Sequence, residues 1–193
     1  MLNSKAVAGD RLGASVVQQN SSNEGIKGGG VFTVQCHDKD GNLKWEAQSP
    51  NLVVNVGLKD MNDKYFTGSG YTATWFIGLY GAAASNNPAA GDTSASHAGW
   101  TEVTAYSQAT RPAAVFAAAT TADPSVISNS GSPAVYSING TTTVGGAFLI
   151  SNNTKGGTTG VLFSAADFQS PGDRSVASGD TINVTYQFSL DAA

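Results

Sequence analysis

The chain has 193 residues and a formal net charge of −4, and only 12% of its residues are Asp, Glu, Lys or Arg. A globular protein commonly has about twice that charged share, and here small and polar residues take the place of charged ones. The length suits one domain, or one domain with an extension, and no apolar run approaches the roughly 18 residues of a membrane-spanning helix. Because there is no basic excess to attract phosphates, we expect no direct binding to nucleic acid or to a membrane.

Residues 1–29 have the composition of a flexible N-terminal arm. They are mainly small and polar, with the run QQNSSNEGIKGG, and show neither strand nor helix periodicity. The first residues also lack the apolar core of a secretory signal, which predicts synthesis in a cytoplasm. Apolar side chains are few in the arm, so we take them as candidate partner-binding residues. They are Leu2, Val7, Leu12, Val16, Val17 and Ile26.

The domain is predicted to cover residues 30–193, and its first strands form a hairpin. Residues 31–36 and 43–47 both alternate apolar and polar side chains, as strands do. The Asp40-Gly41 pair between them predicts a type I′ turn. Cys36 is the only cysteine, so it cannot form a disulfide within the chain, and we expect a buried thiol.

The same turn has a superficial likeness to a calcium loop, through Asp38, Asp40 and Asn42. An EF-hand needs glycine at the sixth loop position and a bidentate acid at the twelfth. Gly41 stands at the fourth position, so the spacing favours a plain hairpin turn without a metal.

The next region is predicted to contain a strand over residues 51–56 and the one short helix over residues 57–66. Apolar side chains recur along that helix at Leu58, Met61, Tyr65 and Phe66. Helical spacing places them on one face, which we expect to cover one end of the domain.

A long strand is predicted over residues 71–80, with Trp75 and Ile77 in the core. The loop over residues 81–99 that follows exceeds the usual length of a connection, which favours a functional role or contact with a neighbour. Its candidate partner-binding residues are Asn86, Asn87, Pro88, Asp92 and His97.

The C-terminal half is predicted to be β-structure throughout. Alternation or β-branched residues indicate strands or extended segments at 100–106, 113–119, 134–139, 144–150, 161–163 and 181–190. Many short strands at near-regular spacing predict an all-β fold, a β-sandwich of the jelly-roll-like kind.

Motifs for catalysis are missing from the sequence. His37 and His97 have no acid or cysteine at zinc-ligand spacing, and there is no nucleophile elbow, Walker loop or dinucleotide fingerprint. The acids lie scattered in predicted turns, so we expect no enzymatic activity and no cofactor. Trp45, Trp75 and Trp100 leave a choice between core packing and a sugar-stacking platform.

Several segments, taken as a set, resemble a family of virion structural proteins of tailed bacteriophages. They are NLVVNVGLKDMNDKYF, YTATWFIGLYG, SHAGWTEVTAYSQATRPA, TTTVGGAFLISNNTKGGTTGVLFSAADF and SGDTINVTYQFSL. The resemblance covers residues 30 to 193 and carries no catalytic residues.

This resemblance implies a capsid decoration or cement protein that binds the major capsid protein. It also implies a homo-oligomer, a dimer or trimer, on a virion assembled in the bacterial host cytoplasm. The alternative is a tail, neck or fibre component with a receptor- or glycan-binding role.

Overall fold

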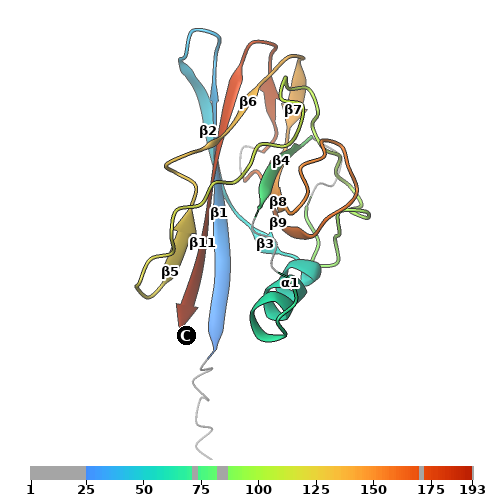
Figure 1. The fold of residues 1–193 in the computed structure, drawn as a ribbon. Helices are drawn as coiled ribbons and strands as arrows, with labels where there is room; N and C mark the ends of the chain where they lie inside the picture. The colour runs from blue at the N-terminus through green and yellow to red at the C-terminus, as the bar shows by residue number, and fades with distance from the viewer. Residues whose placement is uncertain (1–24, 71–73, 82–86, 170–171, 193) are drawn as a thin grey trace, which may run out of the picture.

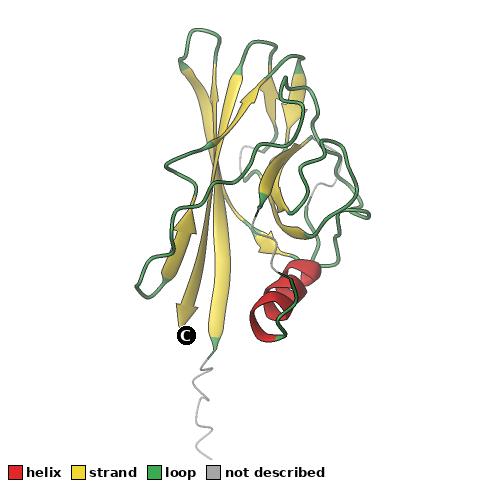
Figure 2. Ribbon diagram, viewed as in Figure 1, coloured by secondary structure: helices red, strands yellow, loops and turns green. Residues whose placement is uncertain are grey.

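The computed structural model describes residues 25–70, 74–81, 87–169 and 172–192, and these residues form mostly antiparallel β-structure with a single helix (Figure 1, Figure 2). The all-β prediction is thereby confirmed at the level of fold class.

The larger sheet contains the first and the last strand of the described chain, side by side. Its order is β2-β1-β11-β5, and β6 also pairs with β11. Phe32 lies opposite Tyr186 in the antiparallel ladder between the two long central strands. The members are β1 (Ile26–His37), β2 (Leu43–Pro50), β5 (Ser125–Ser128), β6 (Ala134–Ser137) and β11 (Thr181–Ala192).

The smaller sheet has the order β3-β9-β8-β4, again antiparallel, and a two-stranded sheet pairs β10 with β7. Every residue of β8 is buried. The strands are β3 (Leu52–Val53), β4 (Phe76–Tyr80), β7 (Thr142–Val144), β8 (Gly146–Ile150), β9 (Leu162–Asp167) and β10 (Arg174–Val176).

The two main sheets meet across the hydrophobic core. Phe163 of β9 packs edge-on against Phe188 of β11, with ring centroids 5.4 Å apart. The buried hydroxyl of Tyr136, on β6, donates to the carbonyl of Ile77, on β4, at 2.6 Å. Burying the phenol is tolerable because this hydroxyl has a partner. The packing therefore joins residues far apart in the sequence.

Strand β1 begins at Ile26, earlier than the expected start of the domain at Gly30. Ile26 pairs with Ala192 and Gly29 with Ser189. The glycine-rich run has almost no side chains to bury, but main-chain hydrogen bonding to β11 does not need them. Periodicity of side chains could not reveal this part of the strand.

The hairpin between β1 and β2 is present, but its turn is not type I′. That turn needs positive φ at both central residues, whereas Gly41 has φ of 86° and no described non-glycine residue has a positive φ. The Asp38 N–H instead donates to the Asn42 carbonyl at 2.9 Å, which encloses a three-residue loop. A carboxylate oxygen of Asp38 accepts from the N–H groups of Asp40 and Asn42, so Asp38 organises the turn.

Other boundaries also differ from the sequence prediction. The helix α1 (Asn55–Phe66) begins before residue 57, which leaves only Leu52 and Val53 in the preceding strand. Segments expected as strands at 100–106 and 113–119 make isolated bridges to β4 through Glu102 and Ala113. Ile77 is fully buried, as predicted, while Trp75 is half-buried against the core.

Candidate functional site: an apolar surface at one end of the domain

Helix α1 packs on the smaller sheet through a glycine. Gly57 is the buried residue of the helix, and a Cβ atom at this position would lie 2.4 Å from the carbonyl oxygen of Phe163. Met61, one turn further, packs against the core. The inward face therefore follows Gly57, Asp60, Met61 and Lys64, which are spaced as one side of a helix.

This orientation leaves large apolar side chains of the helix in water. The exposed fractions are 50% for Leu58, 83% for Tyr65 and 74% for Phe66. The rings of Tyr65 and Phe66 contact each other edge to face, with centroids 4.8 Å apart. The prediction that all four apolar helix residues cover the domain was therefore wrong for three of them. The close contact at Gly57 turns their side of the helix outward.

Helix α1 lies at the same end of the molecule as the start of β1 (Figure 1). Gly57 contacts Phe163, the Phe163 ring packs on Phe188, and a Cβ atom at Gly28 of β1 would lie 3.2 Å from the Phe188 ring. Ile26, two residues before Gly28, is 75% exposed. We call the exposed side chains of Leu58, Tyr65 and Phe66 the apolar end surface.

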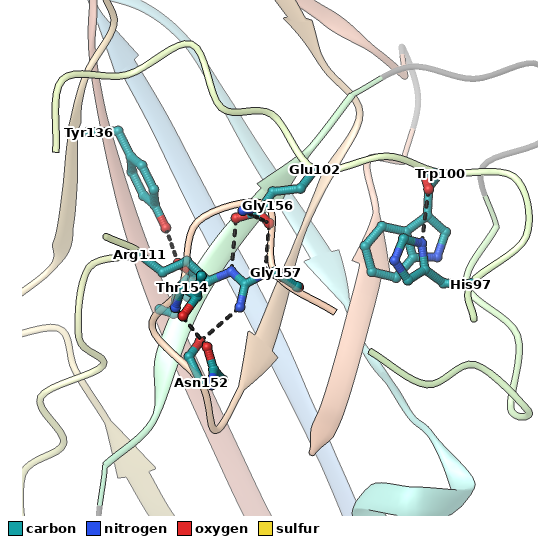
Figure 3. Close-up of polar contacts among 10 residues, drawn as sticks. His97, Trp100, Glu102, Arg111, Tyr136, Asn152, Thr154, Gly156 and Gly157 are labelled. Atoms are coloured by element: carbon teal, nitrogen blue, oxygen red, sulfur yellow. Dashed lines mark hydrogen bonds and ion pairs between the residues drawn. The ribbon is translucent and has the colours of Figure 1, made fainter. Parts of the chain in front are cut away.

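Two predicted contact residues, Asp92 and His97, hold their own loop in place. The Asp92 carboxylate is buried and accepts from the indole N–H of Trp100 at 3.1 Å and from the Ala89 N–H at 3.0 Å. His97 stacks on Trp100 with ring centroids 3.9 Å apart, and its Nδ1 lies 2.9 Å from the Trp100 carbonyl oxygen (Figure 3). Both side chains therefore contact the rest of the domain.

The same loop reaches the beginning of α1, where the Asn55 N–H donates to the Ala90 carbonyl at 2.8 Å. Asn87 is exposed and Pro88 is half-buried. The structure thus brings the loop and the helix together. The remaining predicted contact residues, Leu2, Val7, Leu12, Val16, Val17 and Asn86, lie outside the described residues.

A buried ion pair lies next to the Trp100 region. Arg111 donates from Nε and Nη2 to the two carboxylate oxygens of Glu102, at 2.8 and 2.7 Å. It also donates to the carbonyls of Asn152 and Gly157, both at 2.8 Å, so it ties the 152–157 loop to the domain (Figure 3). The pair could not be predicted from the sequence, because nothing in a spacing of nine positions shows that the side chains of Glu102 and Arg111 meet.

A pocket of about 260 Å³ opens between this ion pair and the His97–Trp100 stack. Glu102 accepts a third hydrogen bond there, because the Gly156 N–H also donates to it at 2.8 Å. The Glu102 carboxylate is thus held by the Arg111 side chain and by one backbone N–H group. The geometry of this pocket supports a structural role for the pair.

The tryptophans pack on other aromatic rings. Trp100 is buried between Tyr80 and Phe148, with centroid distances of 5.0 and 5.2 Å. Trp45 and Trp75 are half-buried and lie edge-on to Phe168 and Phe163. These contacts account for all three indoles by packing.

The described part of the chain has neither a cluster of metal ligands nor a helix that could span a membrane. Nowhere in residues 25–70, 74–81, 87–169 and 172–192 do three or more His, Cys, Asp or Glu side chains gather closely enough to hold a metal ion. In the same ranges, no helix has the length and hydrophobicity needed to cross a membrane.

In comparisons with known proteins, no family model, curated protein or solved structure matches this chain. The apolar end surface is therefore the candidate functional site because of its exposed apolar side chains alone.

Proposed function

We propose that this protein is a bacteriophage virion structural protein, specifically a capsid decoration (cement) protein that binds and stabilises the major capsid protein shell. The observation that carries the proposal is the apolar end surface, where Leu58, Tyr65 and Phe66 project from α1 into water. The resemblance of the sequence to phage virion proteins supplies the kind of partner.

These side chains would gain free energy if a partner covered them. Transferring a large apolar side chain from water to a packed interface contributes about 1.5 to 3 kcal/mol. Tyrosine is also among the residues that most often dominate binding energy. An adjacent, mutually packed Tyr65 and Phe66 therefore fit the centre of a protein interface.

Low surface charge fits the same role. Charged residues are depleted in the buried part of protein interfaces, and this chain has few of them overall. We infer that the two facing sheets form a jelly-roll-like β-sandwich, which presents the apolar end surface to one partner. The shell-bound protein is proposed to be a dimer or trimer, assembled in the bacterial host cytoplasm.

The experiment is removal and return of the protein on purified particles. Mass spectrometry should find the chain in the virion, and particles stripped of it should break at a lower temperature than intact particles. Re-adding the purified protein should restore heat resistance. Stripped particles with unchanged heat resistance, or virions that lack the chain, would contradict the proposal.

A further inference from the structure

A second surface, formed by other residues than the apolar end surface, lies on the outer face of the larger sheet. Strands β1 and β11 alternate, so Phe32, Val34, Tyr186 and Phe188 face the core. The residues between them face outward. A groove of about 260 Å³ runs across this outer face.

The ladder register arranges the floor of the groove in two rows. In the first row, Thr33 of β1 stands between Gln48 of β2 and Thr185 of β11. In the second row, Gln187 of β11 stands between Val31 and Ser128. Directly opposed side chains are about 5 Å apart, so each row is a continuous line of groups across neighbouring strands.

A buried asparagine fixes one wall of the groove. Between β5 and β6, the Asn129 side chain accepts from the Tyr186 N–H at 2.6 Å and donates to the Val184 carbonyl at 3.3 Å. It thereby replaces ladder hydrogen bonds where the edge of the sheet is interrupted. Ser128 and Ser130, on either side, line the groove, and the Ser130 N–H donates to the Ser128 hydroxyl at 3.1 Å.

The polar groups of the groove are uncharged, and some of them make no hydrogen bond within the described residues. Its lining contains hydroxyl and carboxamide side chains with Val31 as the one aliphatic residue, and none is charged. Gln48 makes only a long hydrogen bond, 3.4 Å, to Thr33. Within the described residues, the Thr185 hydroxyl and the Gln187 carboxamide make no hydrogen bond.

We propose that this groove, the sheet-face groove, is a binding site for a neutral oligosaccharide, a role beyond the proposed attachment to a shell. Hydroxyl and carboxamide groups both donate and accept hydrogen bonds, as sugar hydroxyls do. An anionic ligand would find no cation in the lining, and an apolar side chain of a peptide would find only Val31. The Asn129 hydrogen bonds fix the Ser128 and Ser130 side of the groove before a ligand arrives.

The test uses NMR titration of the soluble protein with maltotriose, cellotriose and lactose. At least one sugar should give saturable shifts at the groove residues, with a dissociation constant on the order of 1 mM, since hydrogen bonds without aromatic stacking bind weakly. Gln187→Ala combined with Thr185→Val should weaken that binding at least fivefold. Asn183→Ala is the matched control, because it faces the same side of β11 outside the groove.

Thermal unfolding of both variants checks that each remains folded. Saturable shifts that respond to the groove variant and not to Asn183→Ala support the site. The proposal is overturned if none of the sugars binds, if shifts map elsewhere, or if both variants weaken binding equally. Because no particle is used, these outcomes are independent of whether the protein attaches to a shell.

Discussion

Gly57 of α1 lies against Phe163 of β9 so closely that a Cβ atom at position 57 would be 2.4 Å from the Phe163 carbonyl oxygen. This single approach sets the rotation of the helix. It directs Met61 to the core and leaves Leu58, Tyr65 and Phe66 in water. The candidate interface therefore depends on a residue that is not itself exposed.

The first prediction is that Gly57→Ala destabilises the domain. Replacing glycine by alanine inside a helix ordinarily stabilises it by about 0.5 to 1 kcal/mol. Here the added methyl group must displace backbone, so we expect a loss of about 2 kcal/mol in the free energy of unfolding. Urea denaturation measures it, with exposed Asn62→Ala as the control that should change little. A stabilised Gly57→Ala variant would show that the close contact is wrong.

The second prediction concerns the buried ion pair. Glu102→Gln leaves the Arg111 guanidinium buried without its countercharge, so the free energy of unfolding should fall by about 3 kcal/mol. The double variant Glu102→Leu with Arg111→Met should recover part of that loss, because it removes both charges.

Thermal unfolding of the three proteins makes this comparison. Lys39→Ala is the control, since Lys39 and Asp40 form an exposed pair that should contribute little. If Glu102→Gln lowered the unfolding temperature no more than Lys39→Ala does, the pair of Glu102 and Arg111 would not be buried as described.

The third prediction is a loss of stability in acid that depends on Asp180. This carboxylate is buried, which by itself would raise its pKa, but the Ala177 N–H and Lys44 hold the pKa below its usual value. The folded protein then binds a proton at Asp180 less readily than the unfolded chain. The contribution of Asp180 to the free energy of unfolding is complete above the pKa of the unfolded chain, near 4. It is lost as the pH falls through the lower pKa of the folded protein.

Asp180→Asn should therefore lower the free energy of unfolding at pH 7 by about 2 kcal/mol and flatten the decline below about pH 4.5. Urea denaturation at several pH values measures both effects. An unchanged acid profile in Asp180→Asn would assign the acid sensitivity to other carboxylates.

The fourth prediction is that Cys36 is inert in the folded protein. Burial and the neighbouring Asp180 carboxylate raise the pKa of its thiol to about 11. Because the thiolate is the reactive form, iodoacetamide at pH 8 should label Cys36 only after denaturation. Mass spectrometry of native and urea-treated samples tests this. Rapid labelling of the native protein would indicate that β1 opens readily at this position.

The sequence alone predicted the elements whose side chains alternate. Phe32, Val34 and Cys36 on β1, and Ile182, Val184 and Tyr186 on β11, are all buried, as their period of two requires. Helix α1 was also predicted, because its apolar residues Leu58, Met61, Tyr65 and Phe66 recur at helical spacing.

Periodicity failed where tertiary contacts decide the structure. Which side of α1 faces the core depends on Gly57, and a glycine carries no hydropathy signal. Residues Gly28 and Gly29 join β1 only because β11 is there to pair with them. The role of Asp92 likewise depends on the indole of Trp100, which packs against Tyr80 and Phe148 and donates to the Asp92 carboxylate. The sheet-face groove combines four strands and could not be read from any one segment.

The most direct test of the proposed function is binding of the purified protein to stripped capsid shells, measured by co-sedimentation. The variant Tyr65→Ser with Phe66→Ser removes the centre of the apolar end surface, and Leu43→Ser removes an exposed apolar residue paired with His37 at the other end of β1. We expect the double variant to bind at least about 30-fold more weakly, which corresponds to roughly 2 kcal/mol, and Leu43→Ser to bind as the wild type does. Equal binding by all three proteins, or no binding by the wild type, would contradict the account.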